Sequence, residues 1–167
     1  HRNQMIGFVF QSFNLINFKN ALENVALPLY YRRISRKKRN LIAMEYLDKM
    51  GLKDWAYHLP SEMSGGQKQR VAIARAIMKM APIYIFDDSF SALDFTTDLN
   101  LRKALKQNLS DSTIIIVGQR VASIMDADQI IVMDDGRIVG KGTHKQLMES
   151  CEEYQQIAYS QLSKEEV

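Results

Sequence analysis

Four consecutive residues have types and spacing suited to binding phosphate. Ser64, Gly65, Gly66 and Gln67 stand directly before an apolar helical pattern. The unpaired N–H groups and the positive dipole end of a first helical turn attract anions, and two glycines remove side chains that would keep a phosphate away. Ser64 and Gln67 also have the spacing of a capping box, which explains them locally but does not explain the glycines. The glycines therefore indicate close approach of a phosphate.

A second group consists of two carboxylates that follow an apolar run. "IYIF" (83–86) is typical of a buried strand, and Asp87 and Asp88 come directly after it. Ligands of parallel sheets bind beyond the carboxyl ends of the strands, where a carboxylate holds Mg²⁺ through water. For Asp87 the alternative is a structural acid that caps a loop. The pattern predicts a magnesium site at this edge.

The elements that position these groups alternate between helix and strand. Ser35 is predicted to cap a helix that Gly51 ends, Pro28 to kink or end an earlier helix, and Gly136 to supply the positive φ of a hairpin turn. The predicted helices are 21–31, 36–50, 64–80 and 91–108, and the predicted strands are 6–10, 83–86, 112–118 and 129–134. Apolar strands spaced by helices predict a largely parallel sheet covered on both faces.

Composition limits the class of protein. With 167 residues, 46% hydrophobic and 25% charged, the chain is predicted to form one globular domain. The basic run "RRISRKKR" (32–39) is either a solvated face or a contact with anionic lipid or nucleic acid. Cys151 is the single cysteine, which fits a reducing compartment. No apolar run approaches 18 residues and no signal peptide is recognised, so neither a membrane span nor an export route is expected.

The motifs occur in an order that resembles a known family. "MSGGQKQRVAIARAI" (63–77) resembles the signature motif and following helix of ATP-binding cassette (ABC) ATPases. Gln11 after "GFVF" resembles the Q-loop, "IYIFDD" (83–88) the Walker B strand, "SALD" (91–94) the D-loop and "IIIVGQR" (114–120) the switch-loop strand. The resemblance covers nearly the whole chain. It implies a P-loop NTPase-type α/β fold, a mostly parallel sheet flanked by helices, with a small helical subdomain.

The resemblance also implies a division of the chain. We expect a Q-loop region at 1–19, a helical subdomain at 20–62, a core with signature, Walker B, D-loop and switch loop at 63–135, and a C-terminal hairpin with helices at 136–167. The family's phosphate-binding loop, G-x-x-x-x-G-K-[ST], is not found in these 167 residues. The N-terminal strands and this loop are expected upstream of His1, and the chain alone is expected to bind ATP weakly or not at all.

In the family, two cassettes enclose two ATP molecules between them. The resemblance implies that the signature residues Ser64, Gly65, Gly66 and Gln67 contact the nucleotide held by the partner cassette. It implies that Asp87 and Gln11 serve Mg²⁺, Gln11 through its side-chain carbonyl, although a strand-end amide bonded to backbone is the alternative.

The D-loop residues are Ser91 and Asp94. The resemblance implies that Asp94 crosses to the partner subunit. As the third residue of a helix capped by Ser91, Asp94 also has a local role.

Two positions depart from the family's pattern. Asp88 stands where hydrolysing cassettes usually carry Glu, and Gln119 where they usually carry His. The shorter Asp moves the carboxylate by roughly 1 Å, a displacement that costs ~100-fold in rate at a reacting centre. Gln hydrogen-bonds a phosphate oxygen but carries no positive charge. With Gln11, these residues form the expected catalytic set. They predict a degenerate site of a heterodimer; the alternative is a slowed homodimer.

The two halves of the chain resemble different branches of the family. The N-terminal half resembles lipoprotein-release and macrolide-export cassettes, and the C-terminal half resembles multidrug exporters, with a join near 78–82. We expect the ATPase motor of an ABC exporter that uses ATP and Mg²⁺. The expected partners are a second cassette, preferably in a heterodimer, and a transmembrane permease that holds the chain at the cytoplasmic face of the membrane.

Two other functions remain as alternatives. One is a soluble ABC protein acting on translation or DNA, and the other is a truncated, non-catalytic cassette that only regulates a partner. Only 52 residues separate Gln11 from Ser64, which leaves no room for the long coiled coils of DNA-repair members. No specific nucleic-acid partner is therefore expected.

Overall fold

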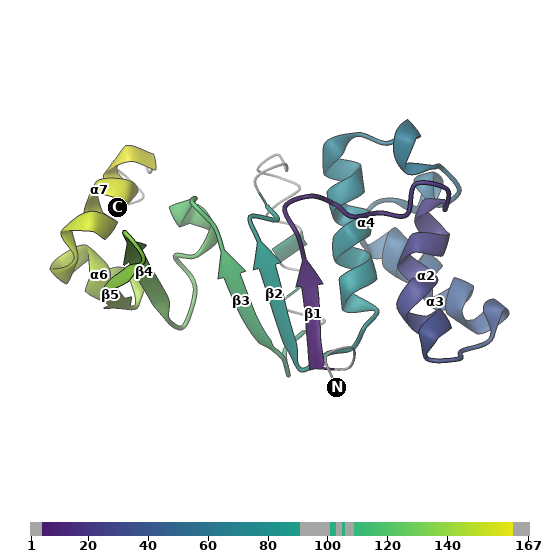
Figure 1. Cartoon of the computed structure of the whole chain (residues 1–167), viewed down its shortest axis with the longest axis horizontal. Coiled ribbons are helices and arrows are strands. Elements are labelled where there is room, and N and C mark those ends of the chain that lie inside the picture. The colour runs from purple at the N-terminus through teal and green to yellow at the C-terminus, as the bar shows by residue number, and fades with distance from the viewer. Residues whose placement is uncertain (1–4, 91–100, 103–104, 106–108, 162–167) are drawn as a thin grey trace. The chain divides into compact units, whose positions relative to one another are not determined.

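The computed structural model describes residues 5–90, 101–102, 105 and 109–161 (Figure 1). The chain forms two compact units, His1–Val117 and Gly118–Val167. The finer boundaries expected from the sequence, at 19/20, 62/63 and 135/136, stay a prediction.

The first unit contains a parallel three-stranded sheet. Its strands are β1 (Ile6–Val9), β2 (Ile83–Asp87) and β3 (Thr113–Val117), in the order β1-β2-β3. Val9 pairs with Phe86, which pairs with Ile116, so the carboxyl ends of the strands lie at one edge. The predicted parallel sheet is confirmed. Its strands match the predicted ones to within a residue or two.

Three longer helices belong to this unit: α2 (Ala21–Tyr31), α3 (Arg36–Lys49) and α4 (Gly65–Ile77). Residues 101, 102 and 105 are helical as well. Two short 3-10 helices, η1 (Lys53–Trp55) and η2 (Pro60–Glu62), join α3 to α4. Helix α4 packs against β1 on one side and α2 on the other (Figure 1). Its side chains share one buried core with the sheet, in which Leu29, Leu47, Ile73, Tyr84 and Phe86 are almost fully buried. A Cβ at Gly7 would overlap the Tyr84 ring, so this position requires glycine.

Two local predictions in this region are met only in part. Pro28 does not end α2, which continues to Tyr31 as the predicted helix 21–31 does, and the kink expected at Pro28 stays a prediction. Leu29, the next residue, is completely buried, and its burial offsets the hydrogen bond that proline cannot donate. Ser35 occupies the N-cap position of α3, but its side chain makes no capping hydrogen bond.

The sequence predicts a sheet covered on both faces, but one face of the sheet is partly exposed. Phe8, Ile85 and Ile115 are register partners and therefore share the face opposite the core. Phe8 is 37% exposed, Ile115 46% and Val117 52%. Within the described residues, the sheet is thus packed on one face only.

The second unit is a hairpin with two helices. Strands β4 (Ile130–Asp134) and β5 (Arg137–Gly142) pair antiparallel, and α6 (His144–Ser150) and α7 (Glu152–Gln161) follow; the short helix η3 (Val121–Ser123) precedes them. Asp135 and Gly136 at the turn both have positive φ, 44° and 75°, as an Asp-Gly hairpin turn requires. The predicted turn is confirmed. Leu147, Tyr154 and Ala158 form a separate buried cluster in this unit.

No helix in the described ranges is long and apolar enough to cross a bilayer.

We predict that Asn24 is a main determinant of stability in the first unit. It is fully buried, its amide oxygen accepts from the N–H of Ile16 at 2.8 Å, and its amide nitrogen donates to three carbonyls, including that of Lys19 at 2.9 Å. Asn24→Ala removes the side-chain partner of the Ile16 N–H and of the Lys19 carbonyl, so it should lower the free energy of unfolding in urea by about 2–3 kcal/mol. The exposed Asn17→Ala is the control and should change it by less than about 0.5 kcal/mol. Equal effects of the two variants would contradict the prediction.

Candidate functional site

The predicted signature residues lie at the start of α4. The Ser64 N–H donates to Gln67 Oε1 at 2.8 Å, and the Gln67 N–H donates to Ser64 Oγ at 3.3 Å, which completes the predicted capping box. This box uses the N–H groups of Ser64 and Gln67 but not those of Gly65 and Gly66, the first two residues of the helix. Gly65 is exposed, and only the Phe13 ring lies near its missing Cβ, at 3.7 Å. The helix start is therefore capped, its first residue is exposed with little side-chain cover, and the free N–H groups suit an anion.

The predicted catalytic residues Gln11 and Asp88 are 77 positions apart but in contact. Gln11 Nε2 donates to Asp88 Oδ2 at 3.2 Å. Gln11 lies two residues beyond β1 and Asp88 one residue beyond β2, and these strands are neighbours. The sequence leaves open that the Gln11 amide bonds to backbone, but in the structure this amide bonds to a carboxylate.

The backbone of Asp88 is in the left-handed region, with φ 44°. Its N–H donates to the carbonyl of Val117, at the end of β3, at 2.8 Å. Aspartate adopts this conformation more readily than most side chains do. This hydrogen bond to β3 therefore fixes the backbone of Asp88, the residue that carries the carboxylate.

Ser89 is a supporting residue that sequence reasoning missed. It is 1% exposed, and its hydroxyl lies 3.0 Å from the carbonyl oxygen of Val9 and 3.2 Å from that of Asp87. It thus joins the ends of β1 and β2, the strands that precede the two predicted groups. A serine after two aspartates gives no signal by itself, because its role depends on a strand 80 residues away.

Arg75 is a second residue that the sequence analysis did not single out. Its guanidinium donates to the carbonyls of Asn14 at 2.7 Å and Phe13 at 3.1 Å. Burial lowers the pKa of Arg75 from its ordinary value. Because Arg75 belongs to α4 and Phe13 lies two residues after Gln11, this side chain links the signature helix to the segment that carries Gln11.

Gln119 belongs to the second unit, where its own backbone is held by α7. Gln161 Nε2 donates to the carbonyl of Gln119 at 2.8 Å, and Gln161 Oε1 accepts from the N–H of Val121 at 2.9 Å. The side chain of Gln119 is exposed. One amide therefore brackets the predicted switch segment, a contact between residues 42 positions apart that the sequence does not reveal.

The predicted magnesium ligands follow neighbouring strands of the sheet. Asp87 is the last residue of β2, and Gln11 lies two residues beyond β1, where it contacts the next carboxylate, that of Asp88. No group of three or more His, Cys, Asp or Glu residues with metal-binding geometry occurs among the described residues. Mg²⁺ in nucleotide sites takes one or two carboxylates, with phosphate and water oxygens as the other ligands. The residues present fit that requirement.

The predicted D-loop residues Ser91 and Asp94 lie outside the described residues.

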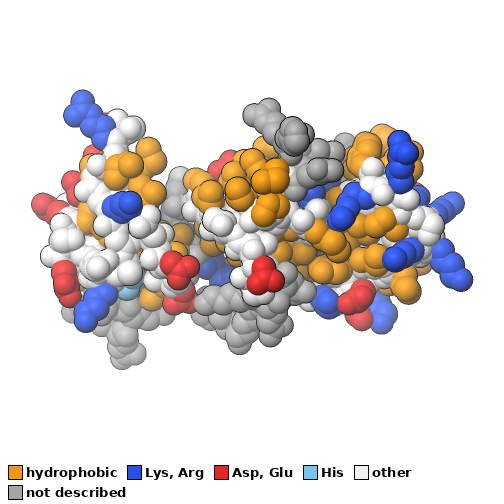
Figure 2. Space-filling view, turned by 90° about the horizontal axis from the view of Figure 1, so that it is seen from below, with side chains coloured by type: hydrophobic (Ala, Val, Ile, Leu, Met, Phe, Trp, Pro, Cys, Tyr) orange, Lys and Arg blue, Asp and Glu red, His pale blue; other side chains and the backbone are white. Residues whose placement is uncertain are grey.

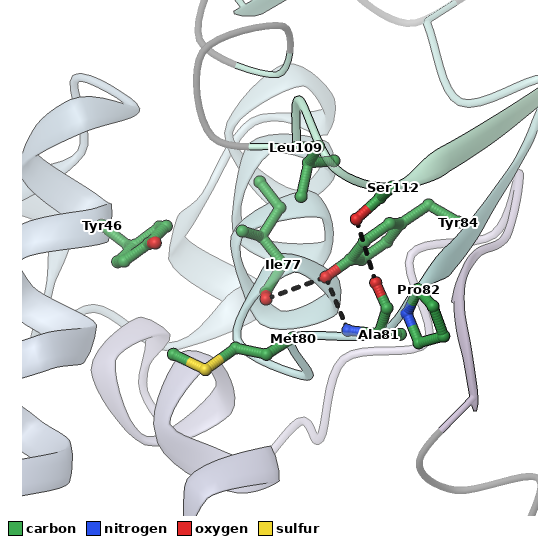
Figure 3. Close-up of a pocket in the computed structure, with 8 residues that line it drawn as sticks. All are labelled: Tyr46, Ile77, Met80, Ala81, Pro82, Tyr84, Leu109 and Ser112. Atoms are coloured by element: carbon green, nitrogen blue, oxygen red, sulfur yellow. Dashed lines mark hydrogen bonds between the residues drawn. The ribbon is translucent and has the colours of Figure 1, made fainter.

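A cavity of about 340 Å³ lies elsewhere in the first unit (Figure 3). None of the predicted site residues lines it. The Tyr84 hydroxyl donates to the carbonyl of Ile77 at 3.2 Å and accepts from the N–H of Ala81 at 3.0 Å, while Ser112 Oγ donates to the carbonyl of Ala81 at 3.1 Å. Both hydroxyls are bonded to backbone groups of the protein. We therefore place the candidate site at the sheet edge and at the start of α4.

Comparison with known sequences identifies relatives. A family model described as ABC transporter matches residues 1–91. The chain is 41% identical over 139 residues to the ABC transporter ATP-binding protein YknY of Bacillus subtilis, covering 83% of this chain and 60% of that protein. It is 40% identical over 146 residues to the methionine import ATP-binding protein MetN of Streptococcus pneumoniae, covering 85% and 41%. A 98-residue match, 52% identical, covers 59% of this chain and 17% of a Mycobacterium tuberculosis ABC transporter ATP-binding protein. The chain thus spans only part of these relatives.

Comparison with solved structures finds ATP-binding cassettes with the same fold. One is an ATP-binding cassette in a dimeric post-hydrolysis state bound to ADP and Pi, with a TM-score of 0.80 and 38% identity over 86% of this chain and 64% of that one. Another is a bacterial Atm1-family ABC exporter with ATP bound, with a TM-score of 0.82 and 30% identity over 98% and 29%. The predicted P-loop NTPase-type α/β fold is confirmed.

We predict that Arg75 holds the segment after Gln11 on α4. Arg75→Ala removes two charge-assisted hydrogen bonds and should lower the free energy of unfolding by about 2 kcal/mol. It should also speed amide hydrogen exchange between Gln11 and Ile16. Arg75→Lys should be intermediate, because an ammonium lacks the fork that reaches both carbonyls.

Lys68→Ala, a change to another cationic side chain of α4, is the control for these measurements. Unchanged exchange at 11–16 in Arg75→Ala would show that other contacts hold the segment.

Proposed function

This chain belongs to the ABC transporter family, and on that premise we propose that it is part of the ATP-binding motor subunit of a membrane transporter. The observation that carries the proposal is the start of α4. There the capping box of Ser64 and Gln67 fixes a helix end whose first two N–H groups belong to glycines. A site of this kind binds a phosphate without requiring a basic side chain.

The phosphate at α4 is assigned to the nucleotide of a second cassette. Because these 167 residues contain no Gly-rich phosphate loop, α4 contributes only part of a nucleotide site. The similar cassette of known structure is dimeric with ADP and Pi bound. We therefore assign Ser64, Gly65, Gly66 and Gln67 to a composite site between two subunits, and we expect this chain alone to bind ATP weakly.

The chain's own half-site is assigned to the sheet edge. Asp87 and Gln11 would provide oxygen ligands for the magnesium of a bound ATP, and the ion would neutralise charge at the phosphates. Gln11 also holds Asp88 through the 3.2 Å hydrogen bond, and Val117 holds its backbone. These contacts orient the carboxylate that would position water. The D-loop pair Ser91 and Asp94 is proposed to contact the partner subunit.

We assign this half-site to the slow, degenerate class. Asp88 has one methylene less than glutamate, and Gln119 cannot carry the positive charge of a protonated histidine. A heterodimer, with a partner that supplies the faster site, is the assembly that this asymmetry favours. Transport is proposed to run outward, on the resemblance of both halves to export cassettes. A permease would hold the subunit at the cytoplasmic membrane face.

Gly66→Trp in the assembled transporter tests the composite site. The indole would occupy the space where the partner's phosphate approaches, and ATP turnover should fall by about 100-fold, the cost of a 1 Å misplacement at a reacting centre. Tryptophan at the exposed Ser61, close to the helix start in sequence, should leave turnover within about twofold. Circular dichroism would establish that both variants fold. Normal turnover in a folded Gly66→Trp assembly would refute the composite site.

Asp88→Glu combined with Gln119→His tests the degenerate site in the same assembly. Restoring the longer carboxylate and an ionisable ring should raise ATP hydrolysis at this site by at least about 10-fold, a modest share of what general acid–base groups contribute. Asp88→Asn is the control and should not increase turnover. The thermal midpoint of the double variant must also be measured, since glutamate tolerates a φ of 44° less well than aspartate. A folded double variant without a gain would end this assignment.

A further inference from the structure

The surface where α2 ends and α3 begins is strongly basic. Between Asn24 and Met44 the chain carries six Lys or Arg residues and no Asp or Glu. We call the five exposed members of this group the basic turn: Arg32, Arg33, Arg36, Lys37 and Lys38. Neither ion pair found in the described ranges, Lys49 with Glu45 and Lys53 with Asp48, involves the basic turn.

The charges of the basic turn destabilise the helix that carries them. Arg36, Lys37 and Lys38 form the first turn of α3, which contains no acidic residue, and the Ser35 side chain supplies no cap. Cations at this end face the positive end of the helix dipole, where acidic residues would stabilise the helix. The charges therefore reduce the stability of the element that carries them. A binding role outside the fold explains this arrangement better than a stabilising role.

Exposed apolar side chains lie within the same surface. Tyr30 is 57% exposed, Tyr31 67%, Leu41 74% and Met80 57%. We call these four the apolar flank. Figure 2 looks onto this end of the first unit, where blue Lys and Arg side chains surround orange hydrophobic ones.

Contacts of Arg32, which belongs to the basic turn, and of the neighbouring Arg39 tie the apolar flank to the basic surface. The Arg39 guanidinium lies 5.2 Å from the centroid of the Tyr30 ring, which packs edge-on against Tyr31 at 5.6 Å. Arg32 Nη1 lies 3.4 Å from Met80 Sδ. Leu41 is one helical turn from Lys37 and Lys38, so it shares their side of α3.

We propose that the basic turn and the apolar flank bind the surface of a bilayer that contains anionic phospholipids. The Lys and Arg side chains would meet the lipid phosphates, and the tyrosines, Leu41 and Met80 would enter the headgroup boundary. Nucleic acid also offers phosphates, and its bases stack on tyrosine. It has no hydrocarbon layer for an exposed leucine and methionine, so the apolar flank favours lipid.

The test is flotation of the full chain with vesicles. Raising phosphatidylglycerol from zero to about 30 mol% in phosphatidylcholine should increase the partition coefficient at least about 10-fold. Most of the gain should disappear between about 0.05 M and 0.5 M salt. Lys37→Glu with Lys38→Glu should lower the partition coefficient onto vesicles with phosphatidylglycerol by about 10-fold or more. This variant should fold, because glutamate suits the first turn of α3. Equal binding with and without phosphatidylglycerol would overturn the proposal.

Matched variants distinguish binding by this patch from a general effect of net charge. Lys141→Glu with Lys145→Glu changes the net charge equally, at exposed positions of the second unit, and should bind anionic vesicles almost as well as the parent. Tyr31→Ser with Leu41→Ser should remove the binding that persists at high salt. An equal loss in Lys141→Glu/Lys145→Glu, or no loss in Tyr31→Ser/Leu41→Ser, would overturn the proposal.

A nucleic-acid arm distinguishes the other class of ligand. We expect a double-stranded oligonucleotide, at equal phosphate concentration, to bind the chain more weakly than anionic vesicles do. Tighter binding of the oligonucleotide, abolished by Lys37→Glu with Lys38→Glu, would assign the surface to nucleic acid and overturn the lipid proposal.

Discussion

Parallel pairing of β1 with β2 is the constraint on which the candidate site depends. Its register places Val9 beside Phe86, so the residues that follow the two strands leave the sheet at the same edge. Gln11 and Asp88 are in contact there, and the Ser89 hydroxyl bonds to carbonyls at the ends of both strands. A shift of this register by one residue would turn the buried side chains of β2 to the other face, so the apolar core also fixes the polar edge.

Helix α4 carries the second candidate phosphate site and connects it to this edge. Its start is fixed by a reciprocal cap between Ser64 and Gln67, and Arg75, near its other end, holds the carbonyls of Phe13 and Asn14. The buried face of α4 packs on α2 and β1. A motion of α4 would therefore reach the segment after Gln11 through hydrogen bonds as well as through packing. Such a link is what a motor needs if nucleotide contacts at two places are to move together.

The chain departs from local rules at several of the positions that we assign to binding or catalysis. Asp88 takes a left-handed backbone, glycines occupy the start of α4, and cations fill the first turn of α3. Each feature costs some stability, and the common core of α2, α3, α4 and the sheet makes these costs tolerable. All three face solvent or the sheet edge, where a ligand or partner has access.

The sequence by itself determined the features that depend on neighbouring residues. The capping box at α4, the Asp-Gly hairpin, the apolar strands and the order of the family motifs were all predictable, because their geometry is set within a few positions. Tertiary structure decided the rest. The bonds of Asp88 to Gln11 and Val117, the bridge from Arg75 and the amide of Gln161 join residues tens of positions apart, and only the folded chain brings them together. Pro28 does not end α2, because burial of Leu29 offsets the missing hydrogen bond, and that burial energy becomes available only when the core has formed.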